Sequence, residues 1–164
     1  MGGSLFRIYR DVRFSHDKSP YKTHAGAQFR HRAGKNVHAP GFYLHLEPGN
    51  VFTAGGLWKP ESEVLARVRE GILKKPKDWN KAVSGKDFKT HCYLDGEKLK
   101  RPPRGFEDAP PALLESLKWK DFCWVEDLSE EAACRPGFLG KVLESFARAA
   151  PMMKFLTKAV GLEW

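Results

Sequence analysis

Five basic side chains and two carboxylates are crowded into residues 7–24 of this sequence, RIYRDVRFSHDKSPYKTH. Arginine binds phosphate or carboxylate groups through two parallel hydrogen bonds, and an interleaved aspartate can orient one guanidinium while another stays free. This spacing predicts a site for an anionic ligand. The residues that we expect to line it are Arg7, Arg10, Asp11, Arg13, Asp17, Lys18, Tyr21 and Lys22, with Tyr43, His45 and Trp58 beside them. The alternative is a structural lattice in which Asp11 and Asp17 neutralise the neighbouring cations.

A second group of polar side chains alternates along residues 41–47, GFYLHLE. Because successive side chains of a strand point to opposite faces, Tyr43, His45 and Glu47 share one face and the apolar residues between them take the other. Close to an anion site, His45 and Glu47 would supply an acid/base pair for hydrolysis or isomerisation, with Asp11 as a further proton-transfer group. A solvated hairpin face also carries such residues, so both interpretations stay open.

Four histidines recur every seven residues, at His24, His31, His38 and His45. Glycine and proline residues between them break any helix that would align them, and no H-x-x-x-H or H-E-x-x-H spacing occurs. The three cysteines are widely spaced without a C-x-x-C pair, which is typical of reduced thiols. Glycine-rich nucleotide loops and the G-x-S-x-G of serine hydrolases do not occur either. We therefore expect no metal and no cofactor, and the catalytic residues and reaction class stay open.

Positive charge is concentrated near the start of the 164 residues. The net charge is +8, and the first 40 residues alone hold eight basic side chains against two acidic ones. Such a field attracts phosphates, nucleic acid or acidic surfaces. With 41% hydrophobic and 29% charged residues, the composition is that of a water-soluble globular protein. No apolar run approaches the roughly 18 residues of a membrane helix, and no secretory signal is visible, so we expect a cytoplasmic protein without a membrane partner.

The apolar periodicities predict a single α+β domain over residues 1–164, with a mixed or antiparallel sheet packed by helices. The clearest element is a β-hairpin over residues 41–58, turned by Pro48 and Gly49 in a type II turn. Further strands are expected over residues 6–14 and 88–94 and around Phe122 and Trp124. Helices are expected over about 60–74, 78–83, 110–117 and 137–161.

Three positions in the expected strands need special surroundings. Arg10 falls on the apolar side of the half-buried strand expected over residues 6–14, where it requires a carboxylate or carbonyl partner. Gly55 and Gly56 lie within the second strand of the hairpin. A glycine pair there indicates a bulge, or a place where another backbone or a ligand comes close.

Several stretches carry a family resemblance: FRIYRDVRFSHDKSPYKTH, GFYLHLEPG, GGLWKPESEVLARVREGI, LKRPPRGF and PMMKFLTKAV. In this order they resemble the bacterial conserved-hypothetical family known as domain of unknown function 2461. The most specific part is R-x-x-R-D-x-R-F followed by D-K-x-x-Y-K, here Arg7, Arg10, Asp11, Arg13, Phe14, Asp17, Lys18, Tyr21 and Lys22. The resemblance implies no activity, cofactor or catalytic residue, and it favours a functional or fold-critical role for the basic motif.

The resemblance also implies an additional N-terminal part that precedes the basic motif in the family. We therefore expect a domain that lacks this part, either as a natural short form or as a truncated record. The apolar side of the first strand would then need another cover, such as a partner subunit in a homo-oligomer.

The leading hypothesis is a protein that binds an anionic ligand, a phosphorylated small molecule or nucleic acid, through its arginine and lysine cluster. An enzyme of unknown reaction class that uses Asp11, His45 and Glu47 is the first alternative. A non-catalytic interaction module is the second, and it predicts a salt-bridged motif and a sizeable apolar surface patch. No helix-turn-helix, zinc-finger or RNA-recognition signature occurs, so the hypothesis of a nucleic-acid ligand rests on charge alone.

Overall fold

The fold is an antiparallel sheet with helices packed on it, as a computed structural model that describes residues 4–14, 16–33 and 39–164 shows. The strands are β1 (Ala25–Arg30), β2 (Gly41–Glu47), β3 (Asn50–Leu57), β4 (Tyr93–Asp95) and β5 (Phe122–Leu128), in the order β1-β2-β3-β5-β4. The helices are α1 (Ser62–Lys74), α2 (Pro76–Ser84), α3 (Lys86–His91), α4 (Pro111–Leu117), α5 (Glu130–Ala133) and α6 (Phe138–Ala159). The expected α+β class is confirmed.

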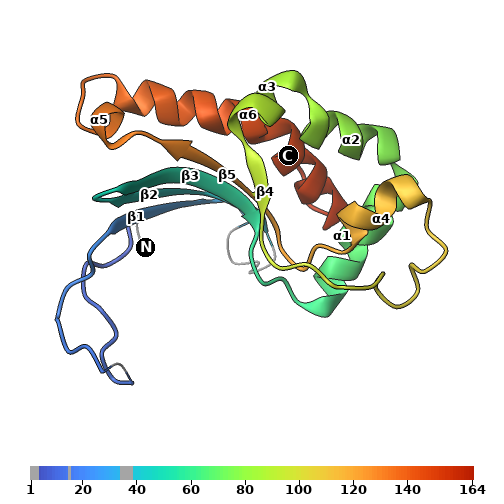
Figure 1. The fold of residues 1–164 in the computed structure, drawn as a ribbon, viewed down its shortest axis with the longest axis horizontal. Coiled ribbons are helices and arrows are strands. Elements are labelled where there is room, and N and C mark those ends of the chain that lie inside the picture. Colours follow the sequence, from blue (N-terminus) through green and yellow to red (C-terminus); the bar gives the residue numbers. More distant parts are fainter. Residues whose placement is uncertain (1–3, 15, 34–38) are drawn as a thin grey trace.

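Helices cover one face of the sheet only. Figure 1 shows α6 lying along that face with α2 and α3 beside it, whereas the opposite face carries no helix in the described part of the chain. The core lies between the sheet and the helices, and its largest fully buried side chains include Trp79, Phe122, Trp124, Met152 and Leu156. In the described part of the chain, this second face of the sheet is therefore not covered by any helix.

The hairpin expected over residues 41–58 is confirmed as β2 and β3. Gly49 has a φ of 75° in the turn, the left-handed value that a type II turn requires. The expected close approach occurs at Gly56, whose φ is 127°. A Cβ atom there would lie 2.0 Å from the carbonyl oxygen of Phe122 on β5. Only glycine therefore lets β3 and β5 pair at this point.

A buried polar network joins the sheet to α6. The Arg148 guanidinium forms an ion pair with Glu126, which is 4% exposed, and Ser145 donates a hydrogen bond of 2.7 Å to the same carboxylate. The Thr53 and Ser145 hydroxyls are 2.6 Å apart. Burial acts to raise the pKa of Glu126, but the hydrogen bonds from Arg148 and Ser145 outweigh it, so the pKa is lowered. The carboxylate is charged and paired inside the fold.

The prediction of a half-buried strand over residues 6–14 is wrong. This segment is extended and makes only single bridges, Leu5 to Ala27 and Tyr9 to Tyr21, and it projects from the sheet (Figure 1). The side chain of Phe14 is 94% exposed. The alternation of apolar and polar residues goes with the pairing of this segment with residues 20–28, through hydrogen bonds such as that from the Lys22 amide to the Ile8 carbonyl (2.9 Å). None of the described residues in the segment is buried, so it does not cover a core.

Two other expectations need correction. The strand expected over residues 88–94 begins as helix α3, from which Phe88 reaches the core at 4% exposure, and only Tyr93–Asp95 is a strand. Short apolar runs do not distinguish buried helices from strands. No strand was expected at β1, because its sequence AGAQFR is small and polar and its pairing with β2 defines it. The helices expected near residues 60–74, 78–83, 110–117 and 137–161 are confirmed.

Replacing Gly56 with alanine tests the close approach of β3 and β5. The Gly56→Ala protein should lose about 3 kcal/mol of unfolding free energy or fail to fold, because the new Cβ overlaps the Phe122 carbonyl at a strained φ. Gly140→Ala is the matched control, since a Cβ at this position in α6 meets open space, and it should gain up to about 1 kcal/mol. Urea denaturation measures both, and equal stability of the two variants would contradict the structure.

Removing one partner of the buried ion pair tests the network. Arg148→Met leaves the Glu126 charge buried and unpaired, so the variant should lose about 3 kcal/mol at pH 7. Because the pKa of Glu126 is lowered in the fold, the contribution of the pair is present above the ordinary glutamate pKa of 4.5 and is lost as the pH falls. The difference from the parent protein should therefore shrink in acid.

The control is Arg135→Met, which breaks an exposed ion pair with Glu131. It should change the unfolding free energy by less than about 1 kcal/mol at any pH. Urea midpoints at pH 7 and pH 4 give the comparison, and a loss in Arg148→Met no larger than in Arg135→Met would contradict a stabilising role for the buried pair.

Candidate functional site

The uncovered face of the sheet is hollowed into a cleft of about 670 Å³, a size typical of small-molecule sites. Small side chains of β2, β3 and β5 form its floor, namely Gly41, Ala54, Gly56, Cys123 and Val125. Aromatic side chains rise around the floor, namely Phe6, Tyr43, Phe52 and Trp58. The pleat explains this division, because the alternate residues of β3 face α6 and are buried. The cleft is thus an apolar concavity with aromatic walls.

Trp58 and Lys59 form one end of the cleft. The Trp58 side chain is 75% exposed, and the Lys59 ammonium lies 5.0 Å from the centroid of its ring. Lys59 has a φ of 47°, an unfavourable value for a residue with a side chain. Its amide donates a 2.7 Å hydrogen bond to the carboxylate of Asp121, which also accepts the Glu97 amide at 3.1 Å. The buried Asp121 therefore holds this end of the cleft in place.

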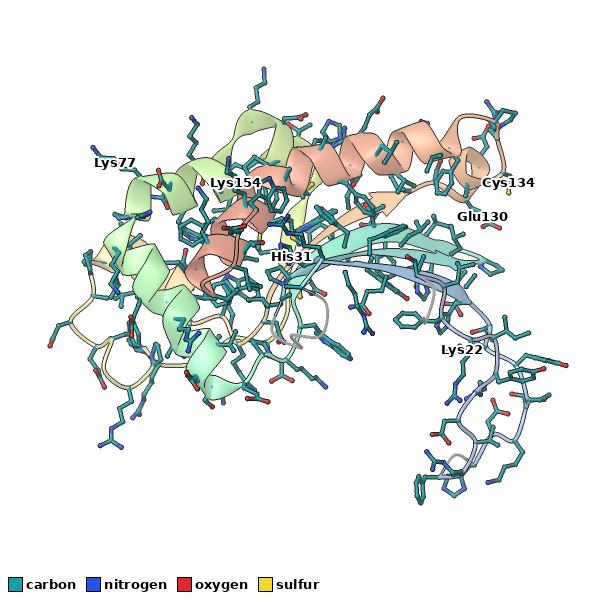
Figure 2. The ribbon with its side chains drawn as sticks, turned by 180° about the vertical axis from the view of Figure 1, so that it is seen from behind. Lys22, His31, Lys77, Glu130, Cys134 and Lys154 are labelled. Atoms are coloured by element: carbon teal, nitrogen blue, oxygen red, sulfur yellow. The ribbon has the colours of Figure 1, made fainter. Side chains whose placement is uncertain are left out.

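The other end lies where residues 4–24, which we call the arm, leave the sheet. Phe6 lines the cleft, and its ring centroid is 6.1 Å from that of Tyr43. The ammonium of Lys22 lies 5.5 Å from the Phe6 centroid, and Figure 2 shows Lys22 in the part of the arm next to the sheet. Lys22 forms no ion pair with any carboxylate of residues 4–14, 16–33 and 39–164. A half-buried cation is thus available beside the aromatic wall.

Tyr43, His45 and Glu47 share the uncovered face, as their alternation predicts. The Tyr43 hydroxyl is 2.9 Å from Nδ1 of His45, and Nε2 of His45 is 3.3 Å from Glu47. The Thr23 hydroxyl donates to the second oxygen of Glu47 at 2.5 Å. The hydrogen bonds from Thr23 and His45 lower the pKa of Glu47. Burial and the nearby Glu47 charge raise the pKa of Tyr43, so its hydroxyl stays protonated at neutral pH.

The outer part of the arm satisfies most of its own charges. Arg10 forms an ion pair with Asp17, so the partner expected for this arginine is present although the residue does not face a core. Arg13 pairs with Asp11 at 2.6 Å. The hydrogen bonds from the Ser19 amide and hydroxyl and from Arg10 lower the pKa of Asp17 to about 2. Hydrogen bonds from Arg13 likewise lower the pKa of Asp11.

The remaining cations of the arm differ in their surroundings. The Lys18 ammonium donates to the Val12 carbonyl at 2.9 Å. Arg7 is exposed and forms no ion pair with a described residue, although its charge contributes to lowering the pKa of Asp11. Tyr21 packs against Tyr9 across the arm, with ring centroids 5.6 Å apart. The arm therefore keeps a net positive charge, although Arg10 and Arg13 are neutralised by its own aspartates.

The residues that the sequence marks as candidates fall into two places. Tyr43 and Trp58 line the cleft, His45 lies beneath Tyr43, and Lys22 stands at its edge. The others lie along the arm: Arg7, Arg10, Asp11, Arg13, Asp17, Lys18 and Tyr21. Of the acid/base group expected from Asp11, His45 and Glu47, the structure joins His45 to Glu47 and bonds Asp11 to Arg13 instead.

Sequence reasoning missed Phe6, Phe52, Lys59 and Asp121. The period of two in β3 places Phe52 on the face of Tyr43, and this signal was present in the sequence. Nothing in the sequence connects Asp121 to Lys59, which lie 62 residues apart. The glycine pair was a usable signal for this region. Gly55 and Gly56 both line the cleft, and so does Cys123, whose backbone comes close to Gly56.

Two of the three cysteines lie near or within the core. Cys123 is on the cleft floor, and burial, with Asp121 and Asp95 nearby, raises the pKa of its thiol to about 12. Burial and the Glu126 charge raise the pKa of Cys92 to about 12. Cys134, in contrast, is exposed. No group of three or more histidine, cysteine or acidic residues in the described ranges is arranged to hold a metal ion.

Comparison with known proteins identifies a family but no better-known relative. A family model described as "Conserved hypothetical protein (DUF2461)" matches residues 1–155. No curated protein and no solved structure matches the chain. Within the described residues, none of the helices combines the length and the apolar character that crossing a bilayer requires.

Alkylation tests the surroundings of the thiols. At pH 8 a thiol with a pKa of about 12 is ionised in only about one molecule in ten thousand, so iodoacetamide should modify Cys134 and leave Cys92 and Cys123 as thiols. Peptide mass mapping measures the modified fraction. In denaturant all three should react alike, and modification of native Cys123 as fast as Cys134 would contradict the burial of the cleft floor.

Proposed function

The chain belongs to the conserved hypothetical protein family DUF2461, and we propose that it binds an anionic small molecule with a planar apolar part in the cleft on the uncovered sheet face. The observation that carries the proposal is an aromatic-walled cleft with an ammonium at its edge, that of Lys22, which forms no ion pair with a described residue. The cleft would take the apolar part, and Lys22 would take the anionic group.

The apolar part is supported by the walls of the cleft. Phe52 stands beside Tyr43, with ring centroids 5.9 Å apart, and Trp58 and Phe6 close the two ends. Half-exposed aromatic rings around a floor of glycine and alanine leave a flat space in which a ring system can stack. Each stacked ring contributes about 1 kcal/mol or more beyond simple burial.

The direction of the ligand follows from the charges of the lining. Asp95 lines the cleft near Trp58, so its charge disfavours an anion at this end even though Lys59 is there. At the other end, Lys22 and the exposed Arg7 belong to the arm, and Tyr43 and Gln28 add uncharged hydrogen-bonding groups. These charges favour a ligand whose anionic group points toward the arm.

Phosphorylated aromatic molecules combine the two required features. A nucleoside monophosphate has one planar ring system and one phosphate, and its size suits a cleft of about 670 Å³. Single-stranded nucleic acid offers the same chemistry repeated, with bases that stack on aromatic side chains and phosphates that attract a basic arm. The proposed ligand is a small nucleotide, and the test below also includes an oligonucleotide as the competing ligand.

A second candidate function is an interaction module. It is favoured by the apolar side chains that the arm exposes, with Leu5 at 76%, Ile8 at 59% and Phe14 at 94%. A partner that covers the arm, such as a second copy of this chain, would bury them. In that case the cleft would show no preference for anions.

Displacement of the fluorescent dye anilinonaphthalene sulfonate tests the proposed function. The dye is aromatic and anionic, so it should bind the parent protein and be displaced by adenosine monophosphate more effectively than by adenosine. Lys22→Ala should weaken the displacement by the monophosphate about fivefold, which corresponds to about 1 kcal/mol, and leave that by adenosine unchanged.

The matched control is Lys77→Ala, because Lys77 is exposed on α2, far from the uncovered face (Figure 2). Adenosine monophosphate should displace the dye from this variant as effectively as from the parent protein. Adenosine that competes as well as its monophosphate, or equal behaviour of Lys22→Ala and Lys77→Ala, would overturn the proposal. If an oligonucleotide binds tightly and the monophosphate does not, the ligand is single-stranded nucleic acid and not a small nucleotide.

A further inference from the structure

A second hollow, which we call the helical groove, lies among the helices. Its volume is about 1050 Å³, and it is lined by residues of α1, α2 and α6 together with Trp164. The groove and the cleft share none of their described lining residues. The glycine and alanine residues that leave room between the helices are Gly71, Ala82, Ala147, Ala150 and Ala159. A Cβ atom at Gly71 would lie 3.1 Å from that of Ala159, so α1 and α6 approach closely there.

The helical groove is strongly positive. Two acidic residues line it, Glu70 and Asp78, and the basic residues that line it are Arg67, Lys74, Lys75, Lys81, Lys154 and Lys158. The excess of these six cations over the two carboxylates is half of the net charge of +8 that the whole sequence carries. The fold therefore gathers at one place cations that lie far apart in the sequence, and such a field attracts polyanions.

Most of these cations are not neutralised by the protein itself. Arg67 and Lys74 each pair with a glutamate one helical turn earlier, at 2.6 Å and 3.2 Å. Exposed lysines that form no ion pair with a carboxylate in the described part of the chain are Lys75, Lys81, Lys154 and Lys158. Asp78 lies in the first turn of α2, where the positive end of the helix dipole offsets its charge. Four ammonium groups are thus available to a ligand.

The helical period explains how α6 contributes to the groove. Ala147, Pro151, Lys154 and Lys158 recur at intervals of three or four residues, so they share one face, whereas Leu156 and its buried neighbours face the core. Lys154 and Lys158 are one turn apart, about 6 Å along the helix axis. Figure 2 shows Lys154 on α6 among the helices. The two ammonium groups can therefore contact successive anionic groups of an extended ligand.

Helix dipoles account for only part of this arrangement. Lys74, Lys81 and Lys158 lie in the last turns of α1, α2 and α6, where a cation stabilises the negative end of the helix. Lys154 lies before the last turn of α6, and Lys75 follows the end of α1. The dipole carries about half an elementary charge, so it does not cancel a lysine.

An aromatic ring stands among the lysines because of the way α6 ends. The Gly161 amide donates to the Lys158 carbonyl at 3.1 Å, and the Leu162 amide donates to the Thr157 carbonyl at 3.0 Å. Gly161 has a φ of 83°, the left-handed value of a Schellman motif. This motif reverses the chain after the helix, and Trp164 then lines the groove with 53% of its surface exposed. One face of the indole is thus open to stacking.

The residue types of the groove distinguish between classes of polyanion. The planar fork of arginine suits the carboxylates of an acidic peptide, whereas lysine is a point charge that suits phosphate oxygens. The cations without an ion pair in the groove are lysines, and Arg67 is already paired. An exposed indole stacks on nucleobases, and a single strand offers its bases for stacking while a duplex keeps them inside. Phosphates and accessible bases occur together in single-stranded nucleic acid.

We propose that the helical groove binds single-stranded nucleic acid, with phosphates on the lysines of α2 and α6 and a base stacked on Trp164. This inference goes beyond the proposed function, because it concerns another site and a polymeric ligand. Neither proposal requires the other. An oligonucleotide in the groove leaves the dye in the cleft undisturbed, so dye displacement and oligonucleotide binding report on different sites.

Fluorescence anisotropy of a labelled oligothymidylate of about ten nucleotides tests the groove. If four phosphates are neutralised, a logarithmic plot of affinity against salt concentration should have a slope of about −3, so binding weakens about sevenfold for each doubling of the salt. The double variant Lys154→Ala/Lys158→Ala should bind about tenfold more weakly and should have a slope shallower by about 1.4.

The matched control is Lys100→Ala/Lys141→Ala, which removes the same charge. Both lysines are exposed and lie outside the described lining of the groove. Lys141 belongs to α6, about 20 Å along the helix from Lys154. The control should bind oligothymidylate within about twofold of the parent protein and keep its salt slope. Equal binding by the two double variants would overturn the proposal.

The stacking contact is tested separately with Trp164→Leu. Loss of the indole should weaken the binding of oligothymidylate about tenfold and leave the salt slope unchanged, because stacking releases no counterions. Its control is Trp58→Leu, since Trp58 is 75% exposed but lines the cleft. This control should bind oligothymidylate as the parent does. A Trp164→Leu protein that keeps the parental affinity would contradict the stacked base.

Competing ligands and the cleft variants complete the test. Polyglutamate or a DNA duplex that binds as tightly as oligothymidylate would overturn the assignment to single strands. Oligothymidylate binding that is weakened by Lys22→Ala or Trp58→Leu, but not by the groove variants, would move the strand to the cleft and overturn this inference. Adenosine monophosphate should displace the dye equally well from Lys154→Ala/Lys158→Ala and from the parent. A parent protein that passes the dye test but binds no oligothymidylate overturns the groove alone.

Discussion

The register between β2 and β3 is the constraint on which both faces of the molecule depend. Pairing places His45 opposite Phe52 and Leu44 opposite Thr53, so one set of residues faces α6 and the other faces the cleft. A shift of one residue would exchange the faces, burying the Tyr43, His45 and Glu47 side chains beneath α6. The turn at Gly49 and the packing of Phe42 on Phe146 oppose such a shift.

The two faces use carboxylates in different ways. Glu126, on the helix side, is neutralised by Arg148 and Ser145 and excluded from solvent, so its hydrogen bonds join the sheet to α6. Glu47, on the cleft side, is bonded to His45 and Thr23 and has no arginine or lysine partner among the described residues. The hydrogen bonds from Thr23 and His45 lower the pKa of Glu47, so this carboxylate is charged on the open face without an ion pair of that kind.

The arm shows how local charge and tertiary placement combine. Its aspartates pair with the arginines two and seven residues away, Asp11 with Arg13 and Asp17 with Arg10, and such local pairs form wherever the segment lies. The contacts of Phe6 and Lys22 are different, because the Phe6 ring reaches Tyr43 only through the pairing of the arm with β1. The arm thus brings to the cleft an aromatic ring and a cation that forms no ion pair among the described residues.

The sequence by itself determined the α+β class, the hairpin of β2 and β3, the main helices and the shared face of Tyr43, His45 and Glu47. Each of these follows from short-range periodicity, turn chemistry or a fixed alternation of side chains, which residues next to one another in the chain are enough to specify. The same periodicity was misleading over residues 6–14, because alternation reports pairing with a neighbouring segment and does not reveal whether a core lies beneath.

Only the tertiary structure decided which face of the sheet stays open, which cations stay unpaired, and which residues meet in the cleft. Trp58 and Phe6 close opposite ends of one cavity, and Asp121 holds Lys59 from 62 residues away. Gln28 meets Tyr43 because β1 pairs with β2 at one register. These contacts depend on the packing of distant segments, whose free energies are summed over the whole core and leave no mark in any local stretch of residues.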